Sequence, residues 1–155
     1  MKELKDFFMG FAHAARGIGY GIATQRNLRI HIVAFCVVVI FGMMARLSAT
    51  HWCTVILCCM AVIGLELMNT ALETLCDKVS PKEHTLVRHC KDAAAGAVLL
   101  SAVGSLAVAV MLLVSEPIYR VNIAYVMTIP KSRIGLVVDA LAALVFIFIP
   151  NGKRK

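Results

Sequence analysis

Long apolar runs dominate the chain, and polar positions are concentrated between the runs and at their ends. Three runs, over residues 28–47, 52–78 and 90–114, each hold the roughly 20 predominantly apolar residues that a helix needs to cross a bilayer. The pattern therefore predicts three transmembrane helices. A further run over 134–149 is sixteen residues long and contains Asp139, so it is a candidate fourth span of marginal length.

The beginning of the chain follows a different pattern, in which apolar positions recur every three or four residues. This spacing gives a helix one apolar stripe, and Lys5, Asp6, His13 and Arg16 fall away from that stripe. We expect an amphipathic helix over about residues 2–24 that lies on the membrane surface. A secretory signal is disfavoured because no continuous apolar core with a small-residue cleavage site follows the early lysines.

Composition and charge support a multi-pass membrane protein. Apolar residues make up 60% of the chain and charged residues 16%. With a cytoplasmic amino terminus and four crossings, twelve of the 16 lysines and arginines face the cytoplasm, as the positive-inside rule requires. We therefore expect the cell inner (cytoplasmic) membrane, with residues 116–133 as an external loop on its surface. The net charge of +7 indicates attraction to anionic lipid and no nucleic-acid site, because basic and aromatic residues share no stripe.

The second apolar run contains four polar residues, Glu66, Asn69, Glu73 and Asp77, that a soluble core or a plain membrane span would not need. At about 100° per residue, all four lie within roughly 80° of one another on a helix. Each acid at bilayer depth costs about 2.5–3.5 kcal/mol, so three acids on one face predict cation binding or proton abstraction. Two other interpretations stay open: polar groups that only join helices, and an ion or proton relay.

A short polar loop follows this helix, and Lys91 and Asp92 then open the third span on the cytoplasmic side. Glu73, Asp77 and Asp92 could hold Mg²⁺ through one or two carboxylates, and Lys91 and Arg88 could neutralise phosphate oxygens. The sequence contains no P-loop or protein-kinase motif, so a site for phosphoryl transfer has to be built from the membrane helices.

One stretch of the chain resembles the signature of the prokaryotic diacylglycerol kinase and undecaprenol kinase family: GLELMNTALETLCDKVSPKEHTLVRHCKDAAAGAVLL. The pattern E-x-x-N-[ST]-A-x-E-x-x-x-D appears without gaps, and RNLRIH at the first span is also similar. The resemblance implies a membrane lipid kinase domain over residues 1–117, with 118–155 as a carboxy-terminal extension. It also implies a surface helix plus three transmembrane helices, assembled as a homotrimer with active sites shared between subunits at the cytoplasmic interface.

The same resemblance implies an enzyme that transfers the γ-phosphate of MgATP to the hydroxyl of a membrane lipid. Carried over by position, Glu66 would be the general base and Glu73 a ligand of the Mg²⁺ cofactor. The residues that would form the rest of the nucleotide site are Asn69, Asp77, Lys82, Glu83, His84, Lys91, Asp92 and, from the surface helix, His13. Depth along the helix agrees with these roles, because Glu66 is the deepest acid and Glu73 lies nearer water.

One departure from the family pattern concerns the metal site. Where the family usually has a second metal-binding glutamate just before RNLRIH, this chain has Gln25. An amide oxygen can still bind Mg²⁺, but without a negative charge it should bind more weakly. Either Gln25 remains at the metal or the chain is a catalytically impaired member of the family. The forms KDAAAGAVLL and RNLRIH look more like the undecaprenol kinase branch, so undecaprenol is favoured over diacylglycerol as the lipid.

Overall fold

The computed structural model describes residues 2–80 and 84–150, and these residues form helices and no strand. The six helices are α1 Lys2–Thr24, α2 Arg26–Ala45, α3 Ala49–Val79, α4 Thr85–Ser115, α5 Pro117–Met127 and α6 Pro130–Phe148. Three of them, α2, α3 and α4, are long and apolar enough to cross a membrane. The predicted all-α membrane fold is therefore confirmed. Lipid offers no hydrogen-bond partners to the backbone, so a segment that crosses it satisfies its N–H and C=O groups within a helix.

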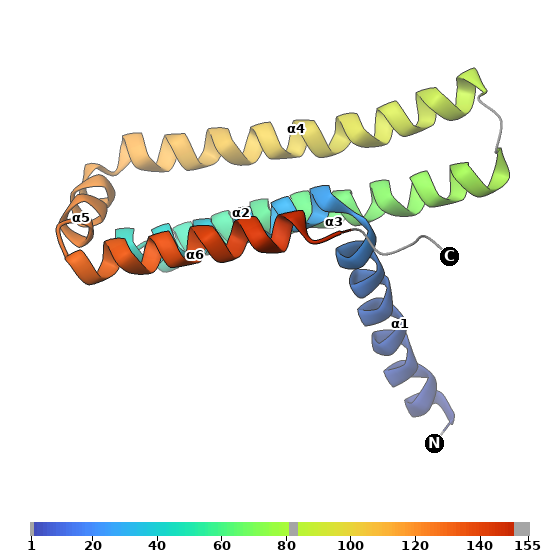
Figure 1. The fold of residues 1–155 in the computed structure, drawn as a ribbon, viewed down its shortest axis with the longest axis horizontal. Coiled ribbons are helices and arrows are strands. Elements are labelled where there is room, and N and C mark those ends of the chain that lie inside the picture. The colour runs from blue at the N-terminus through green and yellow to red at the C-terminus, as the bar shows by residue number, and fades with distance from the viewer. Residues whose placement is uncertain (1, 81–83, 151–155) are drawn as a thin grey trace.

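Helix α6 occupies the candidate fourth span but is not among the three long apolar helices. It carries Lys131, Arg133 and Asp139 within its 19 residues. It nevertheless packs along α2 and runs antiparallel to it (Figure 1). The two helices have similar lengths, 20 residues for α2 and 19 for α6. A fourth membrane crossing stays a prediction.

The helices meet in a layered arrangement in which α3 and α4 form an antiparallel hairpin and α2 packs on α3 (Figure 1). Helix α1 leaves one end of this bundle at a steep angle. Where α1, α2 and α3 meet, a Cβ on Gly21 would lie 2.7 Å from Leu28 Cδ2 and 2.9 Å from Leu67 Cδ2. Leu28 is fully buried there. The glycine therefore lets the surface helix approach the bundle closely.

The opposite end of the bundle is closed by a tight turn between α2 and α3. Arg46 ends α2 in the left-handed conformation (φ 59°), and Ser48 caps α3 by accepting a hydrogen bond from the His51 N–H. Gly42 lies directly against the Trp52 indole. A Cβ at position 42 would be only 2.6 Å from the ring, so the contact requires glycine.

Residues 116–133 differ from the predicted external loop, because most of them form α5 and the start of α6. Pro117 and Pro130 are the first residues of these two helices, where proline is favoured because its missing N–H has no helical partner anyway. The prolines therefore mark helix starts, which the loop interpretation missed. Helix α5 lies across the end of the bundle that carries the α2–α3 turn (Figure 1).

Candidate active site

Three of the five buried polar or charged residues in the described part of the chain lie on α3. Glu66, Asn69 and Thr70 have only 3%, 5% and 4% of their surface exposed. The Thr70 hydroxyl donates a hydrogen bond to the Glu66 carbonyl (2.9 Å), and Asn69 Nδ2 donates one to Glu73 Oε1 (3.1 Å). The Asn69–Glu73 bond joins two side chains one turn apart on the polar face of α3, whereas the Thr70 bond goes to the backbone of α3.

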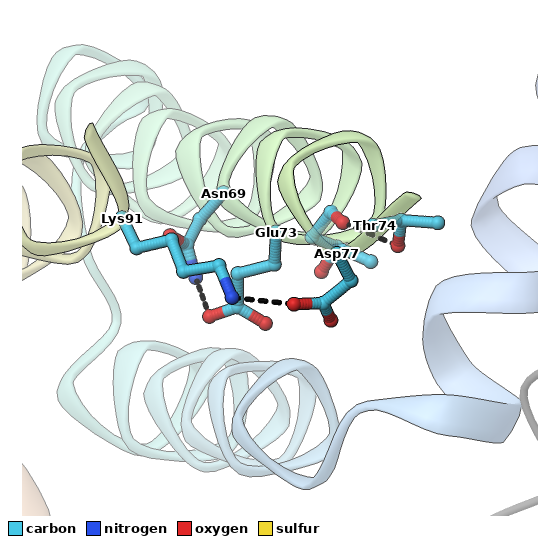
Figure 2. A network of polar contacts seen from close by, with 6 residues as sticks. Asn69, Glu73, Thr74, Asp77 and Lys91 are labelled. Atoms are coloured by element: carbon cyan, nitrogen blue, oxygen red, sulfur yellow. Dashed lines mark hydrogen bonds and ion pairs between the residues drawn. The ribbon is translucent and has the colours of Figure 1, made fainter. Parts of the chain in front are cut away.

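The polar face continues toward the α3–α4 connection, where an ion pair joins the two helices. Lys91 Nζ of α4 donates to Asp77 Oδ1 of α3, and both side chains are partly exposed. Figure 2 shows the Glu73 and Asp77 carboxylates and the Lys91 ammonium group pointing into the same space. The structure thus places two carboxylates, an amide and a cation at one end of the membrane bundle.

A short break in the helical chain lies at the same end of the bundle. Gln25 separates α1 from α2 with an extended backbone (φ −116°, ψ 114°). Its side-chain nitrogen Nε2 is buried and has no hydrogen-bond partner among the described residues. Thr24 before it is also buried, and its hydroxyl donates to the Tyr20 carbonyl (2.8 Å).

An apolar groove of about 710 Å³ runs between α1 and α3 beside the polar face. Its lining includes Gly17, Ile18 and Tyr20 from α1 and Leu67 and Thr70 from α3. At about 100° per residue, Thr70 lies roughly 40° from Glu66 around the helix, so it borders both the polar face and the groove. Thr70 was not among the residues predicted from the sequence; its position one turn after Glu66 was the available signal.

Comparison with known proteins decides the family. Residues 12–113, about two thirds of the chain, match the model of the prokaryotic diacylglycerol kinases. The chain belongs to the prokaryotic diacylglycerol kinase family. This confirms the resemblance drawn from the sequence and makes the protein a lipid kinase, a phosphotransferase with an alcohol group as acceptor.

Two curated relatives in this kinase family are similar over the same region. An undecaprenol kinase from Bacillus subtilis is 44% identical over 101 residues, covering 65% of this chain and 82% of that protein. A diacylglycerol kinase from Synechocystis is 38% identical over 104 residues, covering 66% of this chain and 59% of that protein. No solved structure matches the chain.

The structure brings some of the predicted site residues of this kinase together and leaves others apart. The structure gathers four of them into one space: Asn69, Glu73, Asp77 and Lys91 (Figure 2). The three from α3 follow the buried Glu66 along the same helix. His84 caps the start of α4, where its Nδ1 accepts from the Leu86 N–H (3.3 Å). The cap holds the first turn of the helix that carries Lys91.

Four other predicted positions are placed outside this cluster or outside the described chain. His13 is exposed on α1, and its Nδ1 accepts a hydrogen bond from Arg16 (2.8 Å). Asp92 is exposed on the first turns of α4. Lys82 and Glu83 lie outside the described residues.

The side-chain oxygen atoms of Glu73 and Asn69 are suited to bind Mg²⁺ that is already coordinated by the phosphates of a nucleotide. Asn69 Oδ1 is buried beside the Glu73 carboxylate and has no hydrogen-bond partner within the described part of the chain. The described residues contain no group of three or more His, Cys, Asp or Glu side chains that could hold a metal. Mg²⁺ typically takes one or two protein carboxylates and completes its shell with phosphate and water. The donor set therefore fits a nucleotide-bound Mg²⁺.

Proposed function

We propose that this lipid kinase transfers the γ-phosphate of MgATP to the hydroxyl of a membrane lipid, with undecaprenol favoured over diacylglycerol. The higher identity is to the relative named undecaprenol kinase, at 44% against 38% for the relative named diacylglycerol kinase. The same preference follows from the KDAAAGAVLL and RNLRIH forms of the sequence.

The observation that carries the proposal is the position of Glu66 between an apolar groove and a cluster of charges. The groove between α1 and α3 suits a hydrocarbon tail, and Thr70, which lines it, lies about one helical turn after the buried Glu66. A lipid in the groove would present its hydroxyl to the polar face of α3. Glu66 would then accept the hydroxyl proton as general base, a role that typically contributes 10²–10⁴-fold to the rate.

The charged end of the site is proposed to receive the nucleotide. Glu73 and the unpartnered Oδ1 of Asn69 would bind Mg²⁺, with Gln25 at the α1–α2 junction as a further ligand. The bound ion would neutralise charge on the transferring phosphoryl group. Lys91, held by Asp77, would orient the phosphate oxygens, and His84 with Asp92 would border the nucleotide.

A homotrimer with shared sites would bring the remaining predicted residue to the nucleotide. His13 is exposed on α1, so it is free to contact a neighbouring subunit of the proposed trimer. The lysine and arginine distribution supports an inner-membrane orientation with the site on the cytoplasmic side.

The direct test is phosphorylation of undecaprenol and diacylglycerol, offered separately with ATP and Mg²⁺ to the purified protein in mixed micelles. We expect a phosphorylated lipid, a higher kcat/KM with undecaprenol, and a loss of at least about 100-fold in kcat for Glu66→Gln. Asp139→Asn is the matched control, since it removes a carboxylate from another apolar helix, α6, outside the site, and it should keep its activity. No product from either lipid at any Mg²⁺ concentration would refute the proposal.

Shared sites predict that two inactive variants can complement each other. When Glu66→Gln and His13→Ala subunits are co-expressed, mixed trimers contain some sites with both residues intact, so activity should return to about a quarter of the wild-type level or less. Each variant alone should stay well below that level. Absence of recovery in verified mixed oligomers would restrict each site to one subunit.

A further inference from the structure

The carboxy-terminal helices α5 and α6 lie beyond the residues that match the kinase family, which end at residue 113. They nevertheless pack along the length of α2 (Figure 1). Helix α5 packs on α2, and α6 returns along α2 to the end of the bundle where α1 departs (Figure 1). The extension is therefore placed to act on both ends of α2.

At the far end of the bundle, three hydrogen bonds that involve side chains join α5 to the α2–α3 turn, one of them from the Ser48 N–H to the Tyr119 hydroxyl at 3.5 Å. The Tyr119 hydroxyl is 2.7 Å from His51 Nδ1, and Asn122 Nδ2 donates to the Ala45 carbonyl at 2.8 Å. Tyr119 is 6% exposed. Buried and paired in this way, α5 fixes where α6 begins relative to α2.

Along the middle of the two helices, α2 and α6 are separated by an apolar groove of about 540 Å³. Cys36 and Phe41 line it from α2, and Asp139 and Phe146 line it from α6. Packing between α2 and α6 is therefore incomplete along this groove.

At the end that carries the kinase site, α6 closes with a contact to the first residue of α2. The Arg26 guanidinium carbon lies 4.6 Å from the centre of the Phe148 ring, a cation–π geometry. Arg26 directly follows Gln25, the residue at which the chain breaks between α1 and α2. The Phe148 contact therefore lies one residue from the α1–α2 junction.

We propose that the carboxy-terminal extension positions the α1–α2 junction, with Phe148 as a positioning residue that acts on Gln25 through Arg26. The role of Gln25 at Mg²⁺ rests on the proposed function, whereas the restraint on the junction does not. The extension, which lies outside the residues that match the family, thus holds the α1–α2 junction in the position that the metal site needs.

The restraint is measured by hydrogen–deuterium exchange of the full chain in micelles, followed at residues 24–30. An exposed cation–π contact is worth about 0.5–1 kcal/mol, so Phe148→Ala and Phe148→Leu should raise exchange there about two- to fivefold. Phe148→Tyr keeps an aromatic face and should keep the wild-type exchange. Leu144→Ala is the matched control, since Leu144 is an exposed residue of α6 one turn earlier and does not line the groove.

The kinetic measurement uses the same variants. Phe148→Ala should raise the Mg²⁺ concentration for half-maximal activity about two- to fivefold with a smaller change in kcat, and Phe148→Tyr should restore it. Unchanged exchange at residues 24–30 in Phe148→Ala overturns the inference. An active wild type whose Mg²⁺ requirement is the same in Phe148→Ala overturns it as well. A wild type that is inactive on both lipids refutes the proposed function. In that case the exchange at residues 24–30 alone tests whether Phe148 restrains the α1–α2 junction.

Discussion

At the scale of single residues, Gln25 is the position at which the proposed metal site departs from the family pattern. It occupies the non-helical step between α1 and α2, and its buried amide nitrogen lacks a hydrogen-bond partner among the described residues. An amide offers Mg²⁺ an oxygen without charge, whereas a carboxylate adds the negative charge that strengthens binding. We therefore predict that Gln25→Glu lowers the Mg²⁺ concentration for half-maximal activity by about tenfold, or ~1.4 kcal/mol.

The control for this prediction is Asn27→Asp, which adds the same charge at an exposed position two residues away. Lipid phosphorylation measured across a Mg²⁺ titration should respond to the first change and much less to the second. Equal responses would mean that general electrostatics, and not ligation at Gln25, causes the effect. If neither variant responds, Gln25 lies outside the metal site.

At the scale of elements, the α2–α3 hairpin depends on one close approach of backbone to ring. A Cβ at Gly42 would lie 2.6 Å from the Trp52 indole, whereas a Cβ at Gly104 would have nothing within 4 Å. Overpacking of this kind costs about 1–3 kcal/mol, and replacing a free helical glycine by alanine gains up to about 1 kcal/mol. Gly42→Ala should therefore lower the thermal unfolding midpoint in detergent, and Gly104→Ala should leave it unchanged or raise it. A Gly42→Ala protein as stable as wild type would show that the indole moves at little cost.

At the scale of the whole molecule, α6 returns the chain to the end of the bundle where α2 begins (Figure 1). With that end in the cytoplasm, the carboxy terminus faces the cytoplasm only if α6 crosses the membrane. We predict that a fluorescent protein fused after residue 155 is bright and that alkaline phosphatase fused there is inactive, because the latter folds only outside. The same two reporters fused after residue 116 should give the opposite pair of results. An external carboxy terminus would mean that α6 lies on the outer surface.

The sequence by itself determined the three membrane helices and the polar face, whereas α5 was predicted as part of a loop. Hydrophobic runs of about 20 residues fix membrane helices because lipid forces each segment to satisfy its own backbone. The four polar residues of α3 share a face because of the helical repeat alone, so the sequence suffices to group Glu66, Asn69, Glu73 and Asp77. The family signature falls within these same local patterns, which is why family membership was also predictable.

Only the tertiary structure decided how separate helices meet. The Lys91–Asp77 pair, the groove between α1 and α3, and the contact of Phe148 with Arg26 join segments far apart in the chain. Hydrophobic periodicity cannot supply such pairings, because every apolar face fits lipid as well as it fits another helix. Packing of small residues and a few polar contacts selects the partners. These contacts turn a row of acids on one helix into a site assembled from several.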